Sequence, residues 1–303
     1  MTPHDVVLLD GGMGQELIHR SKFPPSPMWS GKVLRDETHL VEDVHRDFIV
    51  AGATVVILNT YSITPERLER DSTVDDFEKL QALAIGAANS AIKSVDKNVA
   101  IAGCLPPAVA SYRPEVAPSY EKCLETYRRL VDAQKTASDI FIAETIASKK
   151  EALASLKAGK ESGKKTWVAL TVLDDDGLKL RSGESLAEVA NELLPLEPDA
   201  LLLNCSKPET ITKGLEVLQT FGLPFGAYGN GFVSIDALDP GGTVDALTVR
   251  QDMGPKEYAD EVMKWVAMGA TIVGGCCEVG PAHIEEIASR LKASGHKIVR
   301  PAS

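Results

Sequence analysis

Three observations on the sequence predict a (β/α)8 barrel. Eight short runs rich in Val, Ile and Leu recur along the 303 residues, and apolar residues at helical spacing follow each run. Most of the runs are continuously apolar rather than alternating, which is typical of strands buried on both faces. No linker or shift in composition divides the chain, and such a barrel takes about 250 residues. We therefore expect residues 1–303 to form one barrel domain, with two open α/β domains as the alternative.

The eight expected strands follow one another along the whole chain. Their ranges are 6–10, 54–60, 98–105, 140–146, 166–172, 199–205, 224–230 and 270–277. The first helix between two strands is predicted from Val41, Val44 and Phe48, which lie on one side of a helix. A buried stripe of this kind packs a helix against the sheet.

The last two helices begin at prolines. Pro255 and Pro281 each stand where a proline is tolerated in the first turn, and an apolar stripe follows each of them. Because the chain is longer than a minimal barrel, the excess length should lie in loops. The two longest expected loops are residues 11–39 after the first strand and residues 229–254 after the seventh.

Composition excludes several classes of protein. No apolar run approaches the roughly 20 residues of a membrane span, and the first residues lack the features of a signal peptide, so we expect a cytoplasmic protein without a membrane partner. A net charge of −11 without a basic block disfavours nucleic acid as a partner. Small molecules are therefore the expected partners. The sequence gives no indication of the oligomeric state.

Barrel enzymes build their sites at the carboxyl ends of the strands. The residues expected there are Asp10, Asn59, Cys104, Glu144, Thr171, Cys205, Asn230, Cys276 and Cys277. Three of the five cysteines, Cys205, Cys276 and Cys277, thus stand at the ends of the sixth and eighth strands, which can face one centre. Five cysteines in a long cytosolic chain favour metal binding or catalysis over a disulfide framework.

Three thiolates with a free fourth position are typical of a catalytic Zn²⁺ site. None of the six histidines falls at a strand end, which disfavours a mixed site. An all-sulfur shell activates water poorly, whereas a bound thiol loses its proton and stays nucleophilic, so the pattern indicates thiolate alkylation. The alternative is that the cysteines fill the core or form a redox couple. Cys104 and Cys123 are assigned to packing.

Four motifs, in this order, resemble the homocysteine S-methyltransferase family. They are LLDGGMGQEL at the start, IAETI in the middle, LLNCS at 202–206 and GGCCEVGPAHI from 274. The resemblance covers nearly the whole chain. It implies a (β/α)8 barrel in which Cys205, Cys276 and Cys277 hold zinc, which binds the homocysteine sulfur before methyl transfer gives methionine. It also implies that Glu144 and Asp10 surround the amino group of homocysteine.

Further substrate contacts are expected around these residues. An ammonium group needs anionic partners, which agrees with Asp10 and Glu144, although Asp10 also fits a turn before two glycines. The glycines of DGGMG lack the spacing of a dinucleotide-binding loop, and close approach to a bound amino acid explains them more simply. Asn59 and Asn230 are expected to orient a substrate or to satisfy backbone groups at the barrel mouth.

The methyl donor is less well defined by the sequence. Relatives use a sulfonium compound such as S-methylmethionine or S-adenosylmethionine, betaine, or methylcobalamin fed by a folate module. The 303 residues show no cobalamin or folate domain, which disfavours methylcobalamin unless a separate protein supplies it. Trp29 in PMWSGKVLRD resembles the sulfonium-using branch, and its ring either attracts a cationic donor or closes the loop. Thr145 stands where the betaine branch commonly has tyrosine. A homocysteine-binding or thiol-sensing module without turnover is the alternative function.

Overall fold

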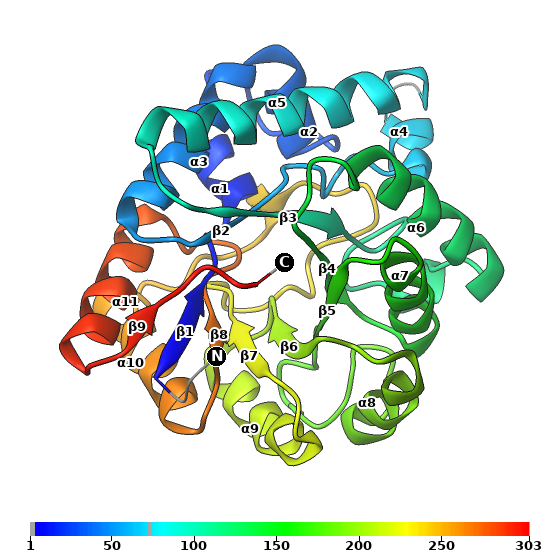
Figure 1. Cartoon of the computed structure of the whole chain (residues 1–303). Helices are drawn as coiled ribbons and strands as arrows, with labels where there is room; N and C mark the ends of the chain where they lie inside the picture. Colours follow the sequence, from blue (N-terminus) through cyan, green and yellow to red (C-terminus); the bar gives the residue numbers. More distant parts are fainter. Residues whose placement is uncertain (1–3, 72–73, 303) are drawn as a thin grey trace.

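The computed structural model describes residues 4–71 and 74–302. Its strands form one curled, parallel sheet in the order β2-β3-β4-β5-β6-β7-β8-β1-β9. They are β1 (Asp5–Leu8), β2 (Val55–Ile57), β3 (Ala100–Leu105), β4 (Ile140–Ile146), β5 (Lys165–Leu170), β6 (Ala200–Asn204), β7 (Phe225–Tyr228), β8 (Ile272–Val273) and β9 (Lys297–Ile298). A parallel bridge between Leu9 and Val55 joins β1 to β2 and closes the barrel. Figure 1 shows this ring of strands inside a ring of helices, which confirms the predicted (β/α)8 barrel.

The helices lie around the outside of the strands (Figure 1). They are α1 (Met13–Arg20), α2 (Ser30–Asp36), α3 (Thr38–Ala51), α4 (Pro65–Asp71), α5 (Phe77–Val95), α6 (Tyr120–Gln134), α7 (Lys149–Glu161), α8 (Leu186–Leu193), α9 (Pro208–Leu218), α10 (Pro255–Ala267) and α11 (Pro281–Ala293). Helix α3 buries Val41, Val44 and Phe48, as the sequence predicts. Pro255 and Pro281 are the first residues of α10 and α11.

Alternating residues of the strands enter two separate apolar clusters, which explains why the runs are apolar throughout. Val7 and Leu9 of the first run, with Ile140 and Ile142 of β4, belong to the cluster inside the barrel. Their neighbours Val6 and Leu8 face outward and pack with residues of the helices. Strands β1 to β8 are therefore largely buried on both faces, as in other all-parallel sheets, whereas Lys297 of β9 is exposed.

Two sequence expectations differ from the structure in extent. Residues 11–39, expected as a loop, contain the short helices α1 and α2, with the prolines of the segment between them. The eighth expected strand, 270–277, pairs with its neighbours only over Ile272–Val273. Beyond Val273 the backbone still bonds to both neighbours, since the Gly274 amide donates to the Ala227 carbonyl and the Gly275 amide donates to the Asp10 carbonyl. The second long loop, 229–254, agrees with the expectation apart from one turn of 3-10 helix, Val244–Ala246.

The end of the chain covers the amino ends of the strands, a feature that the sequence does not indicate. β9 pairs with β1, and the Val299 carbonyl accepts a hydrogen bond of 2.9 Å from Thr54 Oγ1, next to β2. Arg300 then pairs with Asp139 at the start of β4, at 2.6 Å. Pro301 is buried, and Val299 packs against the apolar cluster inside the barrel. The tail therefore seals this end of the barrel, which faces the viewer in Figure 1.

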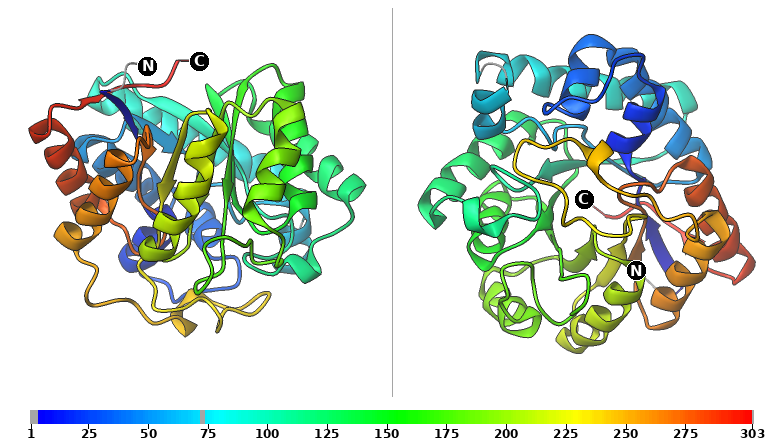
Figure 2. Two further views of the ribbon diagram at one scale, coloured as in Figure 1. Left: turned by 90° about the horizontal axis from the view of Figure 1, so that it is seen from below. Right: turned by 180° about the vertical axis from the view of Figure 1, so that it is seen from behind.

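The segment 229–254 crosses the opposite end of the barrel, as the gold trace shows in the right view of Figure 2. A bridge between Phe232 and Val249 folds the segment on itself. Arg113, in the connection after β3, ties it down by donating to the Leu238 carbonyl at 3.1 Å and to Asp239 Oδ1 at 2.7 Å. This segment therefore bounds any site at the carboxyl ends of the strands.

Over the residues described, no helix is both long enough and apolar enough to cross a membrane.

His45, on α3, is fully buried, and neither of its ring nitrogens has a hydrogen-bond partner within the described chain. Burial lowers the pKa of His45 from 6.5 to about 3. Replacing it with leucine should stabilise the protein by about 1–3 kcal/mol at pH 7, because an unsatisfied buried polar group is removed. Urea unfolding measures this change.

The stabilisation should grow in acid. In the unfolded state His45 binds a proton below about pH 6.5, whereas in the folded state it does so only near pH 3. At pH 5 this difference lowers the free energy of unfolding by roughly 2 kcal/mol. His45→Leu lacks that loss. His39→Leu, at an exposed position of the same helix, is the matched control and should leave the acid dependence unchanged. Parallel stability–pH curves for His45→Leu and the parent would contradict the interpretation.

Candidate metal centre and active site

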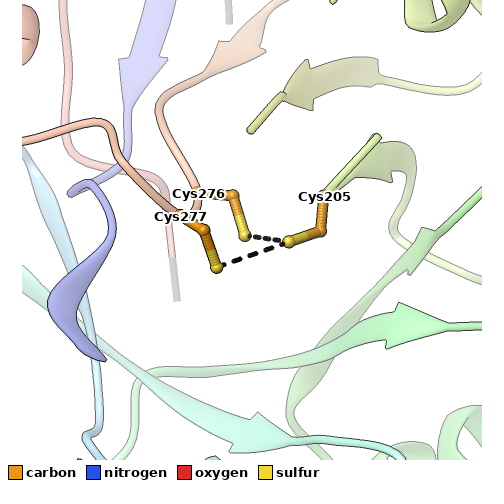
Figure 3. A group of neighbouring side chains, drawn as sticks. All are labelled: Cys205, Cys276 and Cys277. Atoms are coloured by element: carbon orange, nitrogen blue, oxygen red, sulfur yellow. Dashed lines mark hydrogen bonds between the residues drawn. The ribbon is translucent and has the colours of Figure 1, made fainter. Parts of the chain in front are cut away.

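Three cysteine thiols meet at the carboxyl end of the barrel. Cys205 follows β6, and Cys276 and Cys277 follow β8. Figure 3 shows the two neighbouring side chains pointing toward Cys205, whose Sγ lies 2.7 Å from Cys276 Sγ and 3.8 Å from Cys277 Sγ. All three sulfurs lie within 4.8 Å of one another. The structure thus brings together the three cysteines that the sequence singles out.

The backbone holds each side of this cluster. The Cys205 amide donates to the Tyr228 carbonyl at 3.0 Å, and the Cys205 carbonyl accepts from Thr171 Oγ1 at 3.3 Å. On the other side, the Cys276 amide donates to the Gly229 carbonyl at 2.9 Å. Contacts from β5, β6 and β7 therefore orient the three thiols before any ligand binds.

Two glycines after β1 make room for the cysteine pair. A Cβ atom at Gly12 would lie 2.4 Å from the Cys276 carbonyl oxygen, and one at Gly11 would lie 2.1 Å from the Val279 carbonyl oxygen. The amide of Gly12 donates to that Val279 carbonyl at 2.9 Å, and the Gly275 amide donates to the Asp10 carbonyl at 3.0 Å. These glycines therefore approach the turn that carries the cysteines. They also line the cavity, and their approach to a bound amino acid stays a prediction.

The three thiols differ in acidity. Burial favours the neutral form of Cys205, but hydrogen bonds with Cys276, Cys277 and Tyr112 outweigh burial and hold its pKa well below the usual value. Hydrogen bonding to Cys205 is the main cause that raises the pKa of both Cys276 and Cys277. Negative charge therefore collects on Cys205, at the centre of the group.

The donor set fits a zinc ion. Sulfurs at about 2.3 Å from a tetrahedral ion lie about 3.8 Å apart. The Cys205–Cys277 distance has this value, and the shorter Cys205–Cys276 distance requires a displacement of about 1 Å. Three protein ligands leave one position for a further ligand. Cys205 and Cys277 are buried and Cys276 is partly exposed, so an incoming ligand reaches the group past Cys276.

A cavity lies beside the thiols. Its empty volume, including open solvent at the mouth, is about 1140 Å³. Its lining combines three kinds of group. The three cysteines and the carboxylates of Asp10 and Glu144 form one part. The aromatic side chains of Trp29, Tyr61, Tyr112, Tyr228 and Phe232 form another. Arg67, Arg70 and Asp239 are charged groups of the same lining. The cavity therefore offers anionic groups and aromatic faces to one ligand.

The two carboxylates are buried, and few hydrogen-bond donors stabilise their charged forms. Asp10 Oδ2 accepts from the Ile57 amide at 2.9 Å, while Oδ1 has no partner among the described residues. Burial raises the pKa of Asp10 well above its usual value, and burial raises the pKa of Glu144 to about 7. A cation in the cavity would favour the charged form of both groups. The pair is therefore suited to an ammonium group.

Glu144 is held by two hydrogen-bond donors below the cavity. Its Oε1 accepts from Cys104 Sγ at 3.0 Å, and its Oε2 accepts from the Tyr228 hydroxyl at 3.4 Å. The sequence analysis assigns Cys104 to packing, and the side chain is indeed fully buried. Its thiol also orients the carboxylate, which the strand pattern alone does not indicate.

Three other predicted substrate residues line the cavity. Thr145 exchanges hydrogen bonds of 2.9 Å with Asn204, which fixes it beside Glu144. Asn59 makes one long contact of 3.5 Å with the Ser30 carbonyl. The ring of Trp29 packs on Gly14, where a Cβ atom would lie 2.3 Å from it. These side chains therefore border the cavity.

Trp29 is held in a fixed orientation. Its Nε1 donates to Gln15 Oε1 at 3.2 Å, and its ring meets that of Tyr61 edge to face, with 5.7 Å between centroids. The indole therefore presents an ordered wall to the cavity.

Asn230 lies outside the residues that line the cavity. It is buried, its amide donates to the Ser206 carbonyl at 3.1 Å, and its Oδ1 accepts from the Phe232 amide at 3.2 Å. The side chain thus stabilises the turn that leads from β7 into the segment 229–254. Of the two roles that the sequence leaves open for Asn230, these contacts favour the satisfaction of backbone groups.

Left-handed backbone is concentrated around the site. Of the seven non-glycine residues with positive φ in the described chain, five lie at the cavity or beside the thiols: Trp29 (47°), Tyr112 (63°), Thr145 (60°), Cys205 (49°) and Glu278 (65°). Such conformations cost about 1–3 kcal/mol each and persist where surrounding contacts impose them. Most of this backbone strain therefore lies at the site, as is common for functional sites.

Comparisons with known proteins point to one family. The model of the Homocysteine S-methyltransferase family matches residues 7–291. A homocysteine S-methyltransferase of Escherichia coli is 30% identical over 307 residues, covering 94% of this chain and 95% of that protein. Homocysteine S-methyltransferase YbgG of Bacillus subtilis is 28% identical over 305 residues, covering 94% of each. The metallated form of the homocysteine methyltransferase MmuM from Escherichia coli superposes with a TM-score of 0.78 at 26% identity, covering 94% of this chain and 96% of that one.

Replacing Gly12 with alanine should weaken metal binding. The new methyl group would displace the Cys276 carbonyl and, with it, the turn that carries two of the thiols. We expect zinc affinity to fall at least tenfold, as measured by competition with a chromophoric chelator. The loss arises because the thiols no longer converge on one point.

Gly86→Ala is the matched control for this change. Gly86 lies inside α5, and a Cβ atom there meets nothing within 4 Å. This alanine should leave zinc affinity unchanged and raise stability by about 0.5–1 kcal/mol, since glycine weakens a helix. Equal zinc affinities for Gly12→Ala and the parent would show that the glycine contact does not position the thiols.

Proposed function

We propose, since the chain belongs to the homocysteine S-methyltransferase family, that its three thiols hold Zn²⁺ and that its cavity binds homocysteine together with a sulfonium methyl donor. The protein is a methyltransferase that transfers a methyl group to homocysteine and gives methionine. The observation that carries the zinc proposal is the convergence of Cys205, Cys276 and Cys277 beside a cavity lined by carboxylates. Residues 1–303 would act as one homocysteine-binding domain.

The transfer replaces one carbon–sulfur bond by another. The homocysteine sulfur, having lost its proton, attacks the methyl carbon of the donor, and the bond from that carbon to the positively charged sulfur breaks. The electron pair of the broken bond stays on the donor sulfur, which leaves as a neutral thioether. Zinc, when bound, lowers the pKa of the incoming thiol and keeps it nucleophilic at neutral pH.

Asp10 and Glu144 are proposed to bind the amino group of homocysteine. Both carboxylates are almost fully buried, with 1% and 8% of their surfaces exposed, and both line the cavity beside the thiols. Charge-assisted hydrogen bonds to an ammonium group would compensate for the cost of burying them. This contact would direct the thiol of the amino acid toward the cysteines.

The donor is proposed to lie against the aromatic part of the cavity. Trp29 presents its ring there, and a cation over tryptophan gains about 0.5–2 kcal/mol. Thr145 and Asn59 line the same space and are proposed to contact substrate. A sulfonium donor, S-methylmethionine or S-adenosylmethionine, fits the positive charge that this wall favours. Betaine carries a similar charge and is the second candidate.

The proposed location of the protein is the cytoplasm, because thiol ligands need a reducing compartment and all five cysteines are free.

A donor panel tests the proposal directly. Zinc-loaded protein is incubated with homocysteine and, separately, S-methylmethionine, S-adenosylmethionine or betaine, and methionine is quantified. We expect turnover with a sulfonium donor and a much lower rate with betaine. Tight binding of homocysteine without turnover on any donor would favour a binding or sensing module instead.

Cys276→Ala should lose both bound zinc and turnover, because two thiols remain for the ion. Metal content is measured by elemental analysis of protein prepared without oxidation. Cys123→Ala is the control, since Cys123 is a buried cysteine on α6, outside the cavity lining. A Cys276→Ala protein that keeps one zinc per chain would overturn the ligand assignment.

Glu144→Gln should raise the dissociation constant of homocysteine by roughly 10- to 100-fold, because a hydrogen bond to a charged group contributes about 1.5–3 kcal/mol. Zinc content should stay the same, since Glu144 is not one of the three ligands. Calorimetry with the zinc-loaded protein measures the affinity for homocysteine, and elemental analysis measures the zinc content. Glu151→Gln is the matched control, because Glu151 is equally buried but lies outside the cavity lining. Unchanged homocysteine affinity in Glu144→Gln would remove this carboxylate from the site.

A further inference from the structure

Tyr112 touches one of the three thiols, although no sequence motif includes it. It lies in the connection after β3, lines the cavity and is 8% exposed. Its hydroxyl oxygen is 2.9 Å from Cys205 Sγ. Among the five aromatic side chains of the lining, it is therefore the one whose hydroxyl reaches a ligand sulfur.

The direction of this hydrogen bond follows from the chemistry of the ligand. A cysteine that binds a metal ion has lost its proton, so its sulfur can accept a hydrogen bond and cannot donate one. The Tyr112 hydroxyl must therefore be the donor whenever Cys205 binds metal. Groups of this kind around a metal orient the ligand and tune its electron donation.

Tyr112 contacts the sulfur from a strained backbone conformation. Its φ of 63° is unusual for a bulky aromatic residue and costs about 1–3 kcal/mol. The neighbouring residue holds it in place, because Arg113 is hydrogen-bonded to Leu238 and Asp239 across the barrel mouth. Such a conformation at the site indicates that the position of the side chain matters.

Arg181 links Tyr112 and Cys205 a second time. Its guanidinium carbon lies 5.0 Å from the centroid of the Tyr112 ring. The same side chain, 5% exposed, pairs with Asp174 at 2.9 Å and donates to Thr171 Oγ1 at 3.1 Å. Thr171 in turn donates to the Cys205 carbonyl. One buried arginine thus holds both the tyrosine ring and the strand end that carries the thiol.

We propose that Tyr112 is a positioning residue of the metal centre, whose hydroxyl donates a hydrogen bond to the Cys205 thiolate and withdraws negative charge from it. The inference rests on the proposed function, in which three protein thiolates and the homocysteine sulfur share one divalent ion. Four thiolates give that centre a charge of −2, next to the carboxylates of Asp10 and Glu144. A hydrogen bond to one sulfur reduces this excess of negative charge and so favours binding of the fourth thiolate.

Tyr112→Phe tests the inference, because it removes the hydroxyl and keeps the ring that packs against Arg181. Zinc affinity should fall about 10- to 100-fold, as is typical for the loss of a partner of a ligand. With Co²⁺ in place of zinc, the sulfur-to-metal charge-transfer absorption should move to longer wavelength, since the thiolate becomes richer in electrons. A chelator competition and an absorption spectrum of the full-length protein measure the two effects.

Tyr61→Phe is the matched control. Tyr61 lines the same cavity, but its hydroxyl is hydrogen-bonded to Ser111 at 2.8 Å. This variant should keep the parent's zinc affinity and Co²⁺ spectrum. A Tyr112→Phe protein with the parent's affinity and spectrum would overturn the role of Tyr112. Failure of the parent itself to bind Zn²⁺ or Co²⁺ would instead overturn the proposed function, so the two failures are distinguishable.

Discussion

The close packing of Gly11 and Gly12 against the turn from Cys276 to Val279 is the contact on which the site depends. It joins the residues that follow β1 to the turn that follows β8, its neighbour in the sheet. Asp10 lies on one side of this contact and the thiols of Cys276 and Cys277 lie on the other. Backbone hydrogen bonds hold the two sides together. A side chain at Gly12 cannot be accommodated without moving this turn. The pairing of β1 with β8 and the assembly of the site therefore depend on neighbouring residues.

Around that contact, the barrel buries acidic groups, although Arg67 and Arg70 also line the cavity. Asp10, Glu144 and Cys205 are buried within one cavity, and burial opposes ionisation of each. Without a bound cation, burying these groups lowers the stability of the protein, and the positive φ angles of neighbouring residues lower it further. Under the proposed function, a metal ion at the thiols and an ammonium group at the carboxylates would offset this loss of stability.

Much of this site could be predicted from the sequence, because strand ends of a parallel barrel point to a common centre. Asp10, Glu144, Cys205 and the Cys276–Cys277 pair follow from that rule. The rule does not extend to residues whose position depends on irregular backbone. Tyr112 lies in a connection without periodicity, and Asn230 stands at a strand end but turns into the backbone of the next segment. The helices α1 and α2 have eight and seven residues, too short for a clear pattern, and their formation depends on packing. β9 has two residues and leaves no pattern at all.

The tail that crosses the amino ends of the strands limits the side from which small molecules can reach the cavity. With that end filled by Val299 and Pro301, both substrates approach from the side spanned by residues 229–254. Under the proposed function, the two substrates and the two products would therefore share this one side of the barrel.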